Sequence, residues 1–419
     1  MSEAGKKSAQ AQEPQKPADE QLAYLRKGAA EIIREDELKA KLEQSTKTGK
    51  PLRVYLGVDP TAPDIHLGHT VVIRKLKHFQ DLGHTAIFLI GDFSAMIGDP
   101  TGQSETRPPL TREQVMANAK TYLDQVYKIL DRGKTEVRYN SEWLGKMLSH
   151  DVVRLCGHYR LARMLEREDF RSRLENNQPI SVHELLYPLL TACDAVELRS
   201  DVELGATEQK FNILVHRDIQ REYGLTPQVV FTMPILVGLD GVKKMSKSLG
   251  NYVGINEAPK EMFGKLMSIS DELMWSYYEL LTDFEERVIV RLKEEVRTGV
   301  LHPMDAKMQL AHTTIAIFHG EEAAASARDE FQRVFRERQS PEEVPERKLA
   351  CGPPTRISTL LFTSNLAPSR SEAERLIKQG GVEIDGQRID DVKKELDLSK
   401  PASFLVRAGK KKFLRIIVE

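Results

Sequence analysis

Strand-like apolar runs alternate with helical stretches from Leu52 to about Leu239, and this alternation constrains the fold more than any other feature. The clearest strands are predicted at Leu52–Val58, Ala86–Gly91 and Val229–Val237. Apolar runs of this length, separated by amphipathic stretches, are typical of parallel strands connected by helices. The sequence therefore predicts an α/β fold with a doubly wound, Rossmann-like parallel sheet. In such sheets ligands bind beyond the carboxyl ends of the strands.

Composition narrows the class of protein. The 419 residues are 40% hydrophobic and 29% charged, with a net charge of −1, which excludes a protein that is basic throughout. Cys156, Cys193 and Cys351 lie far apart and form no C-x-x-C unit, so we expect neither a disulfide framework nor a protein-bound metal. No apolar run approaches the roughly 18 residues that a membrane span requires. We therefore expect a cytoplasmic protein without a membrane partner.

Five segments are predicted along the chain. Residues 21–50 should be helical, with Ile32 and Ile33 on the apolar face. The segments are a disordered tail over 1–20, the α/β domain over 21–255, a helical domain over 256–338, a linker rich in Pro, Glu and Arg over 339–354, and a small α+β module over 355–419.

Two short motifs fall where the predicted sheet should bind ligands. His66 and His69 lie between a predicted strand and a helix predicted at Val71–Leu82. The N-terminus of a helix presents free backbone N–H groups and favours anions. Lys244 and Lys247 would bring two positive charges to the same anion. The pattern predicts a site for a triphosphate that does not use a Walker loop.

The two motifs, in this order, resemble the signatures of class I aminoacyl-tRNA synthetases. The segments Tyr55–Thr61, Gly98–Gly102, Tyr187–Asp194 and Gly205–Asn212 resemble bacterial tyrosyl-tRNA synthetase, and the similarity runs from about residue 20 to the C-terminus. The resemblance implies that the chain activates L-tyrosine with ATP and transfers it to tRNA(Tyr). It also implies that Mg²⁺ arrives with the nucleotide.

Residue roles follow from the same resemblance. Tyr55 and Asp194 would bind the substrate phenol, Tyr187 and Asp99 its amino group, and Gln209 would lie near its carboxylate. The expected catalytic residues are His66, His69, Lys244 and Lys247. The expected ATP-binding residues are Gly57, Asp59, Thr61, His66, Gly68, His69, Ala206, Glu208, Lys244, Lys247 and Ser248. The expected tyrosine-binding residues are Tyr55, Asp99, Tyr187, Thr191, Asp194 and Gln209.

The C-terminal module carries a second resemblance. Ser369–Gly386 resembles the S4 RNA-binding domain, with a capped basic helix, a glycine turn and a short strand. Residues 351–419 hold 13 Lys and Arg against 9 Asp and Glu, a net charge of +4. The expected RNA-binding residues are Arg370, Arg375, Lys378, Lys410, Lys411 and Lys412.

The resemblance also implies an assembly. The chain would form a homodimer through the segment at about 110–190, with one tRNA spanning both subunits. Residues 256–338 would bind the anticodon.

The sequence departs from the family at substrate contacts. Thr191 stands where the family has glutamine, Cys193 where it has an aromatic residue, Ala206 where it has glycine and Glu208 where it has aspartate. Three explanations remain open. Other contacts compensate; or the chain is a second copy that tolerates an inhibitor resembling tyrosyl-adenylate; or it accepts a phenol-bearing analogue with an altered amino end.

Two further alternatives belong to other classes. An RNA-binding protein on a synthetase scaffold would need only the C-terminal module, but the intact His66, His69, Lys244 and Lys247 argue against it. A tryptophanyl-tRNA synthetase would share the fold. The pair Tyr55 and Asp194, together with the S4-like module, opposes that interpretation.

Overall fold

The computed structural model describes residues 16–99, 110–336, 344–409 and 412–419. The chain forms two compact units, Met1–Ala324 and Ala325–Glu419. Among the described residues, no helix has the length and apolar character needed to cross a membrane. Most of the predicted tail, the motif residues Pro100, Thr101 and Gly102, and the predicted RNA contacts Lys410 and Lys411 lie outside the described residues.

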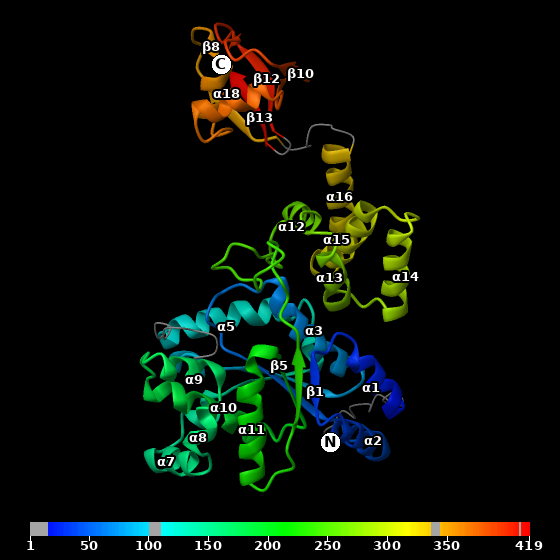
Figure 1. Ribbon diagram of the computed structural model, residues 1–419, viewed down its shortest axis with the longest axis vertical. Coiled ribbons are helices and arrows are strands. Elements are labelled where there is room, and N and C mark those ends of the chain that lie inside the picture. The colour runs from blue at the N-terminus through cyan, green and yellow to red at the C-terminus, as the bar shows by residue number, and fades with distance from the viewer. Residues whose placement is uncertain (1–15, 100–109, 337–343, 410–411) are drawn as a thin grey trace, which may run out of the picture. The chain divides into compact units, whose positions relative to one another are not determined.

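A six-stranded sheet in the order β1-β6-β5-β2-β3-β4 organises the first unit (Figure 1). Its strands are β1 (Glu31–Ile33), β2 (Arg53–Val58), β3 (Thr85–Ile90), β4 (Thr135–Tyr139), β5 (Val202–Ala206) and β6 (Val229–Met233). The pairs from β6 to β4 are parallel, as predicted. The chain runs outward from β2 to β4 and then returns to the other side of β2. The winding therefore reverses between β2 and β5, where such sheets open a crevice.

The prediction of a continuous helix over 21–50 was wrong. A strand, β1, interrupts this segment and pairs antiparallel with the edge of β6. Gly28, at φ +66°, follows the end of α1, and Arg34, at φ +67°, is the N-cap at which α2 begins, so the helical backbone is interrupted on both sides of the strand. Ile32 and Ile33 lie in the strand, because β-branched side chains fit a sheet edge. The first helix begins at Ala18, inside the predicted tail.

Helices cover the sheet on both faces. Phe79 of helix α3 packs edge-on against Phe231 of β6, at 5.8 Å between ring centroids. Tyr55 and Ile87 point to the opposite face and pack with Ala195 of helix α10. The helices of this part are α1 (Ala18–Arg26), α2 (Glu35–Thr48), α3 (Leu67–Asp81), α4 (Ser94–Ile97), α5 (Arg112–Val126), α6 (Ser141–Leu144), α7 (Ser149–Gly157), α8 (Leu161–Met164), α9 (Glu168–Glu175), α10 (Val182–Leu198) and α11 (Lys210–Glu222), with 3₁₀ turns at Arg132–Lys134 and Thr207–Gln209.

Two boundaries near the predicted site differ from expectation. The strand predicted at Val229–Val237 ends at Met233, because Pro234 has no N–H to continue the ladder. Helix α3 begins at Leu67 and not at Val71. The N-cap of this helix is His66, so the histidine motif is the first helical turn itself.

A helical part completes the first unit. Its helices are α12 (Pro259–Met267), α13 (Leu273–Leu281), α14 (Glu286–Arg297) and α15 (Pro303–His319). Helix α16 (Glu321–Phe331) begins in this unit and continues past Ala324 into the second unit, where a π-helical turn follows at Gln332–Arg336. Two buried tyrosines of α13 anchor the helical part. The Tyr277 hydroxyl donates to the Val237 carbonyl at 2.7 Å, and the Tyr278 hydroxyl donates to the Ala306 carbonyl at 2.6 Å.

The second unit is a small α+β fold around its own apolar core. Its five-stranded sheet has the order β10-β9-β12-β13-β7, and β11 pairs with β8. The elements are β7 (Glu346–Leu349), β8 (Thr355–Arg356), α17 (Ile357–Thr363), α18 (Arg370–Lys378), β9 (Val382–Ile384), β10 (Gln387–Ile389), β11 (Glu395–Leu396), β12 (Ala402–Ala408) and β13 (Lys412–Val418). Strand β7 lies within the predicted 339–354 linker. It pairs parallel with β13, so this stretch belongs to the folded unit.

Candidate active site

A cavity of about 420 Å³ opens at the carboxyl ends of β2 and β5, where the winding reverses. Of the residues predicted to bind ATP or tyrosine, only Lys247 does not line it. The predicted residues in its wall are Tyr55, Gly57, Asp59, Thr61, His66, Gly68, His69, Asp99, Tyr187, Thr191, Asp194, Ala206, Glu208, Gln209, Lys244 and Ser248. Side chains that are scattered along the sequence from β2 to the lysine motif therefore share one space.

The two histidines form a stacked, neutral pair at the start of α3. Their ring centroids are 3.8 Å apart. Burial, reinforced by the charge of Lys247, lowers the pKa of His66 to about 4. Burial, reinforced by His66, lowers the pKa of His69 to about 3. The His66 backbone N–H donates to His69 Nδ1 at 3.3 Å, so the neutral His69 ring carries its proton on Nε2.

Gly68 allows this pair to form. A Cβ atom at Gly68 would lie 3.0 Å from the His66 ring and 3.5 Å from the Met245 Cβ, and the first of these distances is closer than most real Cβ contacts. At Gly57 the same test gives an ordinary contact of 3.7 Å with Leu89. A larger residue between the histidines would therefore push the His66 ring from its place, whereas Gly57 is less constrained.

The lysine motif lies on a loop that carboxylates hold in place. Val237 and Lys244 form an antiparallel bridge at the base of the loop. Lys244 Nζ lies 3.0 Å from a Glu208 carboxylate oxygen, and Lys247 Nζ lies 3.5 Å from Asp64. Both ammonium groups thus face anionic partners that a bound phosphate chain would replace.

The same loop is tied to the histidine motif through backbone groups. The Leu67 N–H donates to the Val253 carbonyl at 2.9 Å. The Ser246 N–H donates to Asn251 Oδ1 at 2.8 Å, and the Ser246 and Ser248 hydroxyls are 2.9 Å apart. The chain that follows the lysine motif therefore returns to the first turn of α3.

One end of the cavity holds a buried tyrosine and a buried acid. Tyr55 and Asp194 are 1% and 5% exposed. Trp143 Nε1–H donates to Asp194 at 2.7 Å, and the Asn140 amide donates to it at 3.4 Å. Burial raises the pKa of Asp194 well above its usual range, although these two hydrogen bonds oppose the rise. Burial, with the nearby Glu203, also raises the pKa of Tyr55.

Acidic groups gather around the hydroxyl of Tyr187. This hydroxyl donates to Asp59 Oδ2 at 2.9 Å, and the Ser94 hydroxyl donates to Asp59 Oδ1 at 2.6 Å. Burial raises the pKa of Tyr187, and the charges of Asp59 and Asp99 raise it further. This part of the cavity therefore has a negative potential that suits a cationic group.

The remaining predicted contacts lie on the two turns that leave β2 and β5. The Thr61 N–H donates to the Asp59 carbonyl at 2.8 Å, which shapes the turn after β2. The Ala206 N–H donates to Gln209 Oε1 at 3.3 Å, and Glu208 stands beside them. Cys193, a departure from the family, lies in α10 behind the cavity wall, where burial raises the pKa of its thiol to about 12.

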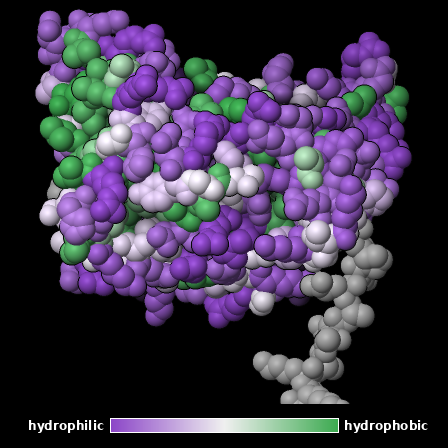
Figure 2. All heavy atoms as spheres, turned by 90° about the horizontal axis from the view of Figure 1, so that it is seen from below, coloured by the Kyte–Doolittle hydropathy of each residue, from purple (hydrophilic) through white to green (hydrophobic). Residues whose placement is uncertain are grey.

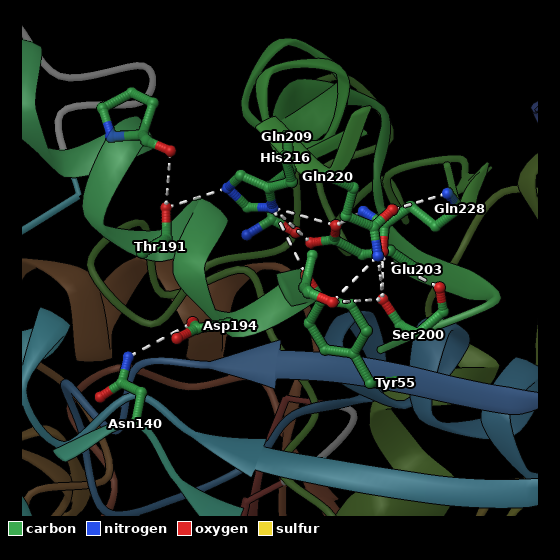
Figure 3. Close-up of polar contacts among 12 residues, drawn as sticks. Tyr55, Asn140, Thr191, Asp194, Ser200, Glu203, Gln209, His216, Gln220 and Gln228 are labelled. Atoms are coloured by element: carbon green, nitrogen blue, oxygen red, sulfur yellow. Dashed lines mark hydrogen bonds and ion pairs between the residues drawn. The ribbon is translucent and has the colours of Figure 1, made fainter. Parts of the chain in front are cut away.

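Thr191 is part of a buried chain of polar groups (Figure 3). Its hydroxyl oxygen lies 2.9 Å from His216 Nε2. His216 Nδ1 lies 2.9 Å from both carboxylate oxygens of Glu203 and 3.4 Å from the Tyr55 hydroxyl. Each of these four residues lines the cavity.

Sequence reasoning missed His216, Glu203, Asn140 and Trp143. His216 follows Gln209 and Asn212 at helical spacing, so all three fall on one face of α11. Asn140 directly follows strand β4, at the edge where ligands were expected. The helical spacing of His216 and the position of Asn140 after a strand could both have been recognised in the sequence.

The predicted RNA contacts that the structure describes lie in the second unit. Arg370, Arg375 and Lys378 are exposed on α18. The Arg375 guanidinium pairs with Glu372 at 2.6 Å, and Lys412 Nζ donates to the Leu366 carbonyl at 3.1 Å. Over the described residues, no group of three or more His, Cys, Asp or Glu side chains is placed to hold a metal ion.

Comparison with known proteins gives matches over most of the chain. Residues 46–336 match the family described as tRNA synthetases class I (W and Y), and residues 355–399 match the S4 domain. A protein named tyrosine–tRNA ligase from Oleidesulfovibrio alaskensis is 56% identical over 400 residues, which cover 96% of this chain and 99% of the relative. Another of that name from Geobacter sulfurreducens is 53% identical over 95% of this chain and 98% of its own length.

Solved structures agree on the fold. A C-terminally truncated mitochondrial tyrosyl-tRNA synthetase from Aspergillus nidulans has a TM-score of 0.64 at 22% identity, covering 76% of this chain and 94% of its own. The tyrosyl-tRNA synthetase of Archaeoglobus fulgidus, complexed with L-tyrosine, has a TM-score of 0.60 at 26% identity, covering 74% of this chain and 99% of its own.

Proposed function

We infer that this chain, which belongs to the class I tRNA synthetases for tryptophan and tyrosine, is an enzyme that ligates L-tyrosine to tRNA. The observation that carries the inference is one cavity that joins the buried Tyr55 and Asp194 to the histidine pair and Lys244. In the first step, the tyrosine carboxylate attacks the α-phosphorus of ATP and pyrophosphate leaves. In the second, a ribose hydroxyl of tRNA attacks the carbonyl carbon of the adenylate and AMP leaves.

The histidines and lysines act on the phosphates. His69 carries its proton on Nε2 and donates a hydrogen bond without carrying charge. Lys244 and Lys247 exchange Glu208 and Asp64 for phosphate oxygens, and so stabilise the negative charge that moves onto the leaving pyrophosphate. Mg²⁺ enters as part of the nucleotide substrate. A general base is not required, because the tyrosine carboxylate is already ionised at neutral pH.

The two ends of the cavity fix the amino acid. Asp194 and Tyr55 bind the phenol hydroxyl, which neither phenylalanine nor tryptophan offers. A non-phenolic competitor would bury the Tyr55 hydroxyl and Asp194 without the hydrogen bonds that a phenol makes to them, and strong rejection of phenylalanine is already an established property of tyrosyl-tRNA synthetases. At the other end, Asp59 and Asp99 supply the negative potential for the α-ammonium group, beside the hydroxyl of Tyr187.

The second unit would hold tRNA through its phosphates. The exposed Arg370, Arg375 and Lys378 on α18 supply the charge, with Lys410, Lys411 and Lys412 as further contacts. Residues 256–338 would contact the anticodon. The protein would act in the cytoplasm, where its tRNA substrate is charged.

A homodimer is proposed through the segment 110–190. Large apolar side chains of this segment are exposed on several of its helices. Figure 2 shows green side chains gathered on the side where α7 to α9 lie in Figure 1. The exposed apolar residues of the segment are Met116, Leu148, Val153, Leu161, Leu174 and Val182. A second copy would remove these side chains from water.

The test is ATP–pyrophosphate exchange, followed by aminoacylation of tRNA(Tyr). We expect strong exchange with L-tyrosine and none with phenylalanine or tryptophan. Robust exchange only with D-tyrosine or β-tyrosine would instead identify a specialised paralogue with an altered amino end. Silence with every amino acid would favour a protein that only binds RNA.

A further inference from the structure

The hydroxyl of Thr191 is fixed by a buried relay that runs across the cavity wall (Figure 3). Glu203, His216 and Thr191 are each at most 7% exposed. Glu203 is held in turn by the Gln228 amide, and the Ser200 hydroxyl donates to Gln228 Oε1 at 2.5 Å. Every member of the relay therefore has a fixed position before any substrate binds.

The contacts define where the protons lie. His216 Nδ1–H donates to Glu203, whose two oxygens are both at 2.9 Å. The Thr191 hydroxyl oxygen lies 2.9 Å from His216 Nε2 and also 2.9 Å from the carbonyl of Tyr187, one turn earlier in α10. A hydroxyl has only one proton to donate. If Nε2 were unprotonated, that one proton would have to serve two acceptors.

An imidazole with a proton on each ring nitrogen would satisfy every contact. Nε2–H would then donate to the Thr191 oxygen, and the Thr191 hydroxyl would donate to the Tyr187 carbonyl. Glu203, 2.9 Å from Nδ1, is the partner that would balance the charge of such an imidazole. In this state the Thr191 oxygen keeps one free lone pair, so it can accept a hydrogen bond but cannot donate one to a ligand.

An acceptor at this position suits one group of the substrate. Thr191 lies one helical turn after Tyr187, whose hydroxyl contacts Asp59 and is near Asp99. An α-ammonium group brings three N–H donors, and it is attracted to the negative potential there.

We propose that His216 and Glu203 are positioning residues, which fix the Thr191 hydroxyl as an acceptor for the α-ammonium group of the substrate. This inference rests on the proposed function and assigns the amino end of that same site. The relay thereby takes over the task of the glutamine that the family carries at position 191. It also explains why a shorter side chain serves there: His216 orients what the threonine cannot orient alone.

The experiment compares two ligands that differ only in the amino group. Dissociation constants for L-tyrosine and for 3-(4-hydroxyphenyl)propanoate are measured by calorimetry on the full chain. Thr191→Val keeps the shape but removes the acceptor. We expect it to weaken L-tyrosine binding roughly tenfold, the size of one hydrogen bond to a charged group, and to leave the amine-free ligand unchanged.

Matched variants separate positioning from packing. Thr191→Ser should restore L-tyrosine affinity, because it returns the hydroxyl. Glu203→Gln removes the counter-charge of His216 and should weaken L-tyrosine selectively, with a higher KM and little change in kcat for exchange. Equal effects on both ligands, or no effect on either, would overturn the proposal, as would failure of Thr191→Ser to rescue.

Failure of the relay can be distinguished from failure of the proposed function. Wild-type protein is first assayed for L-tyrosine-dependent exchange. Absence of exchange contradicts the proposed function. If the wild type shows normal exchange, but Thr191→Val and Glu203→Gln keep the wild-type preference for L-tyrosine over the amine-free ligand, the relay is contradicted and the proposed function is not. If Thr191→Val does not fold, the comparison of Glu203→Gln with wild type still decides the question.

Discussion

At the scale of single residues, the histidine pair shows how burial selects a chemical form. His66 and His69 lose most of their hydration when they stack beneath the lysine loop. A charged imidazole would repel both its neighbour and Lys247. The pair therefore stays neutral at pH 7, and it has N–H groups but no net charge to offer an anion.

Lowering the pH should destabilise the first unit through these histidines. Between their usual pKa of 6.5 and the folded values of about 4 and about 3, the unfolded chain binds more protons than the folded one. Stability is therefore lost as the pH falls from about 6.5 toward 4. The urea midpoint of the wild type should fall between pH 7 and pH 5, and His69→Gln should flatten that fall. His150→Gln, whose side chain is 64% exposed, is the control and should leave the slope unchanged.

Lys244 and Lys247 should both matter for the chemical step. Lys244→Met and Lys247→Met keep the alkyl stem and remove the charge, so each should lower kcat for exchange about 100-fold, the scale of one lost electrostatic stabiliser. The KM for tyrosine should change little. Lys243→Met, at an exposed neighbour in the same loop, is the matched control. An equal loss in Lys243→Met would contradict a specific role for the other two.

At the scale of elements, the lysine loop is a hairpin that α13 holds from below. The Val237 carbonyl at its base accepts the hydroxyl of Tyr277, and the loop returns to contact the first turn of α3. The loop therefore connects the helical part to the first turn of α3. Its base is held by a helix that contributes no residue to the cavity wall.

Two neighbouring tyrosines allow this connection to be measured. Tyr277→Phe and Tyr278→Phe each remove one buried hydrogen bond, and each should cost about 1 kcal/mol of unfolding free energy. Only Tyr277→Phe frees the hairpin, so only it should raise the KM for ATP or lower kcat. Thermal unfolding and exchange kinetics on the same preparations provide the comparison. Equal kinetic effects of the two variants would show that the hairpin is not held by this contact.

At the scale of the whole molecule, the chain is built from two units with separate cores. The first contains the cavity, and the second contains the basic helix α18. The first also exposes apolar side chains over the segment 110–190. All residues that line the cavity belong to the first unit.

Charges placed on that apolar surface should separate the subunits. Val153 and Val182 are each 72% exposed. Val153→Asp combined with Val182→Asp should convert a dimer to a monomer in light scattering, because buried unpaired carboxylates disfavour an interface. Val290→Asp with Val300→Asp, on exposed valines elsewhere in the unit, should leave the dimer intact. A wild type that is already monomeric would contradict the proposed assembly.

Most of the architecture was predictable because its signals are local. The apolar runs that become β2 and β3 have the length and the β-branched and aromatic residues typical of buried strands, and His66 and His69 follow β2 closely. Errors arose where tertiary pairing overrode local pattern. Ile32 and Ile33 continue the helical spacing of the apolar residues before them, but their backbone pairs with the edge of β6. Strand β7 looked like a linker, because its pairing partner β13 lies at the far end of the unit in sequence.

The sequence by itself determined the parallel part of the sheet, the positions of the histidine and lysine motifs and the family, because these depend on residue types at fixed short spacings. Only the tertiary structure decided what surrounds Thr191. Glu203 comes from β5, His216 from α11 and Thr191 from α10, so their hydrogen bonds exist only when three elements pack together. A departure that looked like a lost contact in the sequence became, in the fold, one end of a fully satisfied relay. Hydrogen bonds depend on distance and direction in space, and a sequence specifies neither.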